Sequence, residues 1–97
     1  MAFIQIIEYH TSDPDKVRQL QDEYDRETEG KRTVRRSILT RDRTDSERYL
    51  AIVFFDSNES AMENSGLPET QAVAARLASV VSGPPTFHDL DVIDDRS

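Results

Sequence analysis

The sequence predicts one α+β domain in which two helices cover one face of a four-stranded antiparallel sheet. Four segments carry the β-branched or alternating apolar patterns of strands: 3–9, 31–42, 49–55 and 86–94. Two longer amphipathic segments, 14–29 and 68–82, have the spacing of helices. The length of 97 residues suits a single domain spanning 1–97, with a thin core.

The run 49–55, Tyr-Leu-Ala-Ile-Val-Phe-Phe, is the longest apolar stretch in the chain. Alternate residues of a strand point to opposite faces, and here both sets are apolar. This pattern is typical of a central strand that is covered on both sides. The strand at 3–9 has the same character, with Gln5 and Glu8 as its polar exceptions.

The first helix has clear start and stop signals. Asp13 can cap the free amides, Pro14 suits the first helical position, and Gly30 can end the helix in a left-handed conformation. The segment 31–42 follows and carries several arginines, which predicts an edge strand protected by charge.

The second helical region begins after the central strand. Asp56 and Glu59 have the spacing of a capping box and predict a short helical piece through about residue 63. The segment 64–68 breaks that piece, and a longer helix begins at Pro68. The Gly-Pro-Pro sequence at 83–85 ends this helix.

The resulting order is β-α-β-β-α-β. With right-handed crossovers this order gives a ferredoxin-like sheet, in spatial order 4-1-3-2, with both helices on one face. Two helices cover only one face, so apolar side chains remain exposed on the other whichever way the strands are turned. We therefore expect a homodimer in which two open sheet faces pack together. One parity would expose some of Phe3, Ile7, Tyr9, Tyr49, Ala51, Val53 and Phe55. The alternative is a monomer that tolerates scattered surface aromatics.

Composition excludes several classes of function. A net charge of −7 argues against nucleic acid as a partner and against charge-driven docking on anionic membrane. The chain has no cysteine, and two isolated histidines make a poor metal site, so we expect no metal. There is no signal-peptide pattern and no apolar run long enough to span a membrane, so we expect a cytoplasmic protein.

The order, length and pattern resemble the dimeric α/β barrel superfamily, in particular its antibiotic-biosynthesis-monooxygenase-like group. The most specific match is 49–68, where an apolar strand ends in an aromatic-acidic pair at Phe55-Asp56 and Asn64 precedes Pro68. The resemblance implies oxidation of a small aromatic or quinol-type substrate without a cofactor. The alternative is a ligand-binding or stress-type dimer without turnover. Heme-degrading members use a Trp, which this chain lacks, and a His at the position where this chain has Asn64, and both differences argue against heme.

Three residues are candidates for catalysis. Asn64 stands where family members often have a His; its amide could orient a substrate carbonyl or dioxygen, or it could simply stabilise the helix break. His10 ends the first strand and could act as a general base, or it could be a surface histidine. His88 alternates with Leu90 on the last strand, so it could point under the helices as a proton-transfer group, or be a packed histidine.

Four residues are candidates for substrate binding. Tyr9, Tyr24 and Phe54 could line an apolar pocket for a small aromatic molecule, although aromatics at such spacing are also ordinary core residues. Arg36 and its neighbour Arg35 point to opposite faces of a strand, so at most one of them faces a cavity and could hold a carboxylate or phenolate. The other reading is a solvated charge on an edge strand.

Overall fold

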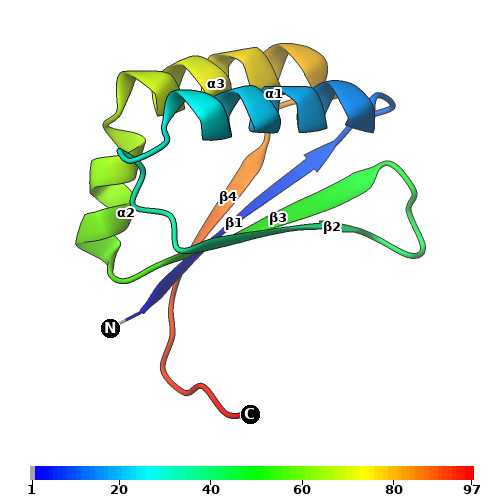
Figure 1. The fold of residues 1–97 in the computed structure, drawn as a ribbon. Helices are drawn as coiled ribbons and strands as arrows, with labels where there is room; N and C mark the ends of the chain where they lie inside the picture. Colours follow the sequence, from blue (N-terminus) through cyan, green and yellow to red (C-terminus); the bar gives the residue numbers. More distant parts are fainter. Residues whose placement is uncertain (1) are drawn as a thin grey trace.

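The computed structural model describes residues 2–97, and the helices lie together on one side of a single sheet (Figure 1). The elements in chain order are β1 (Phe3–His10), α1 (Pro14–Glu27), β2 (Arg36–Arg41), β3 (Arg48–Phe55), α2 (Asn58–Ser65), α3 (Pro68–Val80) and β4 (Thr86–Asp91). The α+β class and the β-α-β-β-α-β order are therefore confirmed, with α2 as a distinct short helix.

The sheet has the predicted topology. Its strand order is β2-β3-β1-β4, and each neighbouring pair is antiparallel. The two most apolar strands, β1 and β3, are thus central, and they pair over their full length from Phe3 opposite Phe55 to His10 opposite Arg48. The arginine-bearing strand β2 is at an edge, as its charge predicted.

The two faces of the sheet differ in burial, because the helices cover only one of them. Residues directly opposite in an antiparallel pair share a face, and alternate residues change face. The odd-numbered residues of β1 and β3 face the helices, because Phe3, Tyr9, Tyr49 and Phe55 are buried. These side chains are therefore not the exposed set; the even-numbered residues form the open face.

Two small clusters make the core between sheet and helices. At one end Phe3 and Phe55 pack with Ala61 of α2. At the other end Tyr9 stacks on Tyr49, with ring centroids 5.7 Å apart, beneath Val17 of α1. The core thus covers one face only, and α1 and α3 lie side by side above it (Figure 1).

Helix α1 begins and ends close to the predicted places. The Asp13 carboxylate accepts from the Lys16 amide, and Pro14 is the first helical residue. The helix ends at Glu27, two residues early, because the Thr28 hydroxyl donates to the Tyr24 carbonyl and closes the last turn. Gly30 has φ of +80° in the following turn, the conformation for which glycine is suited.

The predicted capping box at Asp56 is wrong. Ser57 caps α2, because its hydroxyl accepts from the Ser60 amide. Asp56 instead accepts from the Nε of Arg35 at 2.8 Å. Two strands are also shorter than predicted. The strand expected over 31–42 is β2, which begins at Arg36, and the strand expected over 86–94 is β4, which ends at Asp91.

Candidate functional site

Asn64 and Tyr24 meet in a buried polar network between the helices. The Asn64 Nδ2 donates to the Tyr24 Oη at 2.9 Å, although the two residues are 40 positions apart in the chain. Asn64 is 6% exposed and Tyr24 is 8% exposed. Two of the side chains predicted to form a site are therefore in direct contact, one from α2 and one from α1.

Two threonines hold this pair in place. The Thr33 amide donates to the Asn64 Oδ1 at 3.2 Å, which fixes the orientation of the side-chain amide. The Tyr24 Oη and the Thr70 Oγ1 lie 2.8 Å apart at the start of α3. Among residues 2–97 the Asn64 Nδ2 has Tyr24 as its one partner. Its second hydrogen could therefore donate a hydrogen bond to the oxygen atom of a bound molecule.

His10 lies at the other end of the sheet from this network. It ends β1 opposite Arg48, whereas Asn64 follows the end of β3 that pairs with Phe3. The eight residues of β1 make seven steps of ~3.3 Å, which separate the two ends by roughly 23 Å. The His10 Nε2 is 3.3 Å from the Asp45 Oδ2, and both side chains are nearly half exposed. His10 therefore does not share a site with Asn64.

The expectation that His88 points under the helices is wrong. His88 pairs opposite Ile6, on the open face, and its Nε2 is 3.5 Å from the Glu8 Oε1. The alternation with Leu90 was correct, but both side chains belong to the outer set. The sheet itself lies between His88 and the Asn64–Tyr24 pair.

Phe54 and Arg36 also lie on the open face. They are directly opposite across β2 and β3, and the Arg36 guanidinium carbon is 5.8 Å from the centre of the Phe54 ring. This is a cation–π arrangement. The structure thus brings these two predicted binding residues together, but on the other side of the sheet from Tyr24.

Tyr9 faces the helices, as expected of a pocket or core aromatic, and is 4% exposed. Burial, with a smaller contribution from the neighbouring Tyr49, raises the pKa of the Tyr9 phenol to about 12. The phenol is therefore neutral at physiological pH, and its ring contributes packing in the cluster below α1.

A charged row on the open face was missed by sequence reasoning. The Arg48 Nε donates to Glu8 at 3.0 Å and its Nη1 donates to Asp42 at 2.8 Å. The Arg48 hydrogen bond lowers the pKa of Glu8, and hydrogen bonds from Thr44 and Arg48 lower the pKa of Asp42. The available signal was Glu8 itself, a charged residue in an otherwise apolar central strand.

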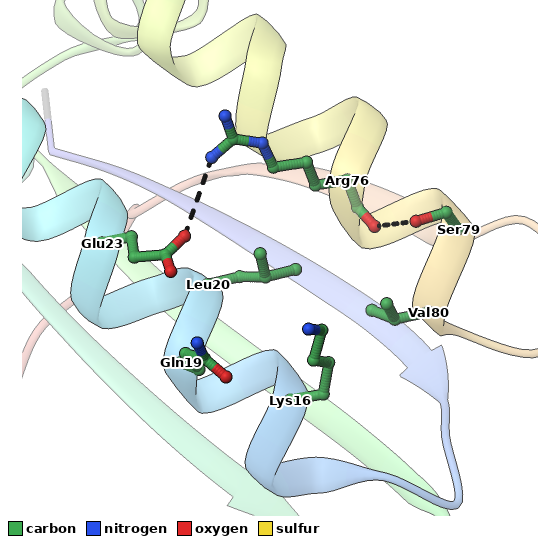
Figure 2. Close-up of a pocket in the computed structure, with 7 residues that line it drawn as sticks. All are labelled: Lys16, Gln19, Leu20, Glu23, Arg76, Ser79 and Val80. Carbon is green, nitrogen blue, oxygen red and sulfur yellow. Dashed lines mark hydrogen bonds and ion pairs between the residues drawn. The ribbon is translucent and has the colours of Figure 1, made fainter.

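Two hollows of moderate size lie away from the Asn64–Tyr24 pair. A groove of about 280 Å³ runs between α1 and α3, and Figure 2 shows the seven side chains that line it. Its charged residues are Lys16, Glu23 and Arg76, and the last two are 3.7 Å apart. A second hollow of about 410 Å³ lies at the β2–β3 turn and includes Asp42. Neither is lined by Asn64 or Tyr24.

The residues described hold no cluster that could bind a metal ion through three or more His, Cys, Asp or Glu side chains. Among residues 2–97, none of the helices combines the length and the apolar character needed to cross a membrane.

Solved structures with the same fold are numerous, although their sequences are distant. SnoaB, a cofactor-independent oxygenase from Streptomyces nogalater solved as an asparagine-to-alanine mutant, superposes with a TM-score of 0.82 at 12% identity, covering 97% of this chain and 95% of that one. A candidate antibiotic biosynthesis monooxygenase from Nitrosomonas europaea gives 0.78 at 7% identity, covering 95% and 90%. This chain has the antibiotic-biosynthesis-monooxygenase fold.

A Mycobacterium tuberculosis protein of the same fold covers 100% of both chains, with a TM-score of 0.79 and 18% identity. In sequence, the chain matches no protein-family model and no curated protein. The resemblance expected from residues 49–68 is therefore confirmed at the level of the fold. At these identities the likeness concerns architecture, and function must be argued from the side chains.

Proposed function

We propose that this protein is a cofactor-independent monooxygenase-like enzyme that oxidises a small aromatic or quinol-type molecule. The observation that carries the proposal is the buried Asn64–Tyr24 hydrogen bond at 2.9 Å, in a fold shared with a cofactor-independent oxygenase. That oxygenase was solved with an asparagine replaced, and Asn64 is the buried asparagine of this chain.

The chemistry assigned to the pair is stabilisation of a substrate oxyanion. An anthrone-type methylene reacts with one O₂ to give a carbonyl and one water, so no external reductant is needed. The substrate first loses a proton to solvent and becomes an electron-rich enolate, and the protons released end in the water that is formed. The free amide hydrogen of Asn64 would donate to the enolate oxygen, which is the kind of charge stabilisation that speeds such steps.

The test is oxygen uptake with a panel of hydroquinones and anthrones. We expect turnover above the buffer rate, and a loss of about 100-fold in kcat for Asn64→Ala, the magnitude seen when one oxyanion donor is removed. Asn58→Ala is the matched control, because Asn58 is an exposed asparagine of the same helix α2. Equal activity in both variants, or no turnover across the panel, would contradict the assignment.

A second candidate is a small-molecule-binding dimer without turnover. It is favoured by the fact that Asn64, Tyr24, Thr33 and Thr70 already hydrogen-bond to one another within the chain. Native mass spectrometry of freshly purified protein distinguishes the two, because a retained aromatic ligand together with absent oxygen uptake supports binding alone.

The proposal includes a homodimer formed through the open sheet face. Seven apolar side chains lie on that face and none is buried: Ile4, Ile6, Ile38, Leu50, Ile52, Phe54 and Leu90. Covering such a patch is favourable at ~25 cal/mol per Å², before the cost of association. A patch of this kind on a small domain is typical of an interaction surface.

A second copy of this chain is the partner that the charges favour. Arg36 and Arg48 balance Glu8 and Asp42 on the open face, whereas the chain as a whole carries −7. Two identical acidic molecules repel least when they meet through their neutral, apolar faces. Two copies packed in this way would form the closed barrel that the sequence resemblance implied.

A further inference from the structure

The open face is apolar except for one charged row at its end. Glu8 is at the centre of that row: one carboxylate oxygen accepts from Arg48 at 3.0 Å and the other is 3.5 Å from the Nε2 of His88. Arg48 is shared in turn with Asp42 at 2.8 Å. The row thus connects β4, β1, β3 and the turn that precedes β3.

Arg36 balances the open face as a whole but lies at its other end, so the charges within this row do not balance when His88 is neutral. Two carboxylates, Glu8 and Asp42, face one guanidinium, Arg48, which leaves one negative charge. In the isolated chain water compensates for that charge, since the Glu8 and Asp42 side chains are 25% and 22% exposed. A second copy covering the face would remove that water, and an uncompensated buried charge is costly.

His88 is the group placed to correct the imbalance. Its side chain is 45% exposed, and its Nε2 lies 3.5 Å from the Glu8 oxygen that Arg48 does not use. Its other neighbours on the open face are uncharged: Ile6 opposite it on β1, and Thr86 and Leu90 beside it on β4. Imidazole is the side chain that changes charge near neutral pH, so a proton here makes the row neutral.

Other charged groups of the face are already accounted for. Arg36 lies over Phe54, at the opposite end from Glu8. His10 pairs with Asp45 at the rim, 3.3 Å away, where both remain solvated. His10 lies opposite Arg48, but its carboxylate partner is Asp45 and not Glu8 or Asp42, so it serves as the histidine control.

We propose that self-association through the open face takes up a proton at His88, so that the dimer is tighter at pH 6 than at pH 8. This inference rests on the proposed dimer but not on the proposed oxygenase activity. A proton that binds the associated state more strongly stabilises it at low pH, and this stabilisation is lost as pH rises. Each dimer contains two such sites, so log Kd changes by up to two per pH unit within the titration range.

The experiment measures the dimer Kd by fluorescence-detected sedimentation, from nanomolar to micromolar concentration, at several pH values between 6 and 8. We expect Kd to increase by about tenfold or more from pH 6 to pH 8. His88→Gln should remove most of this dependence, and His10→Gln should keep it. Glu8→Gln should also remove it and keep the dimer tight at pH 8, because the row is then neutral without a proton.

The outcomes separate the two proposals. A dimer whose Kd is the same at both pH values, or whose pH dependence survives in His88→Gln, overturns the role of His88 and leaves the dimer intact. A folded monomer at every pH and concentration overturns the dimer and this inference together. Loss of the dependence in His10→Gln would assign the proton to the rim pair with Asp45 instead. Far-UV circular dichroism of each variant checks that the fold is retained.

Discussion

Single residues in this chain take their roles from the face of the sheet on which they lie. Tyr9 and His88 both belong to strands and both were candidates for the same pocket. Tyr9 is buried under the helices, whereas His88 reaches Glu8 on the far side. The alternation of side chains along a strand separates them, although in the sequence Tyr9 alternates with Ile7 and His88 with Leu90.

The raised pKa of Tyr9 predicts a loss of stability at alkaline pH. Its pKa is about 12 in the folded protein and about 10 in an unfolded chain. Folding therefore retains a proton that the unfolded chain releases, so this contribution to stability is complete below pH ~10 and is lost as pH rises toward ~12. Urea unfolding across this range, with tyrosinate absorbance, should show the decline.

Tyr9→Phe isolates that contribution. The variant keeps the ring stacked on Tyr49 but cannot ionise, so its stability should decline less steeply above pH ~10 than that of the wild type. Parallel slopes for the two proteins would mean that another group causes the alkaline decline.

At the scale of elements, the capping residues decided the helix boundaries, which periodicity predicted only roughly. The long helices began where Asp13-Pro14 and Pro68 indicated, because these residues act locally. At the start of α2, Asp56 and Ser57 are both residue types that can cap a helix. Ser57 is the N-cap, and Asp56 pairs with Arg35. That outcome depends on a residue 21 positions away, which no local pattern contains.

Replacing Ser57 tests this assignment. Ser57→Ala removes the acceptor for the Ser60 amide and should destabilise the protein by about 1 kcal/mol, the usual value of an N-cap. Asp56→Ala is the control, and because Asp56 makes only an exposed ion pair we expect a clearly smaller effect. Denaturant unfolding measures both, and a larger loss for Asp56→Ala would restore the capping box.

For the whole molecule, the helical layer leaves half of the sheet surface uncovered. The even-numbered residues of β1 and β3 remain accessible, although five of them are large apolar side chains: Ile4, Ile6, Leu50, Ile52 and Phe54. The dimer proposed above is our answer to this imbalance, since residues 2–97 contain no further element that covers the face (Figure 1).

Ile52 is the residue with which to test the dimer, because it lies on β3 between Ile38 and Ile6 at the centre of the open face. Ile52→Asp should raise the dimer Kd by about 30-fold or more, the effect of losing a central contact worth about 2 kcal/mol. Ile93→Asp is the control, since Ile93 is 91% exposed beyond β4. Sedimentation that finds the same Kd for both variants would move the interface elsewhere.

The site was only partly predictable, for a reason that concerns distance along the chain. Asn64 and Tyr24 were both named from the sequence, and their contact spans 40 residues. Thr33 and Thr70, which hold the pair, were not named, because a threonine in a polar segment carries no distinguishing pattern. The Glu8–Arg48 row was missed because its members come from different strands.

The sequence by itself determined the element order, the sheet topology and the excess of apolar strand surface. Those features follow from local periodicity, turn residues and chain-crossing rules, which act over short stretches. Only the tertiary structure decided which set of alternating side chains lies under the helices, and hence that Tyr24 and Asn64 belong to one side of the sheet and His88 and Phe54 to the other. In β1 and β3 both sets are apolar, so the choice depends on which face α1 and α3 pack against.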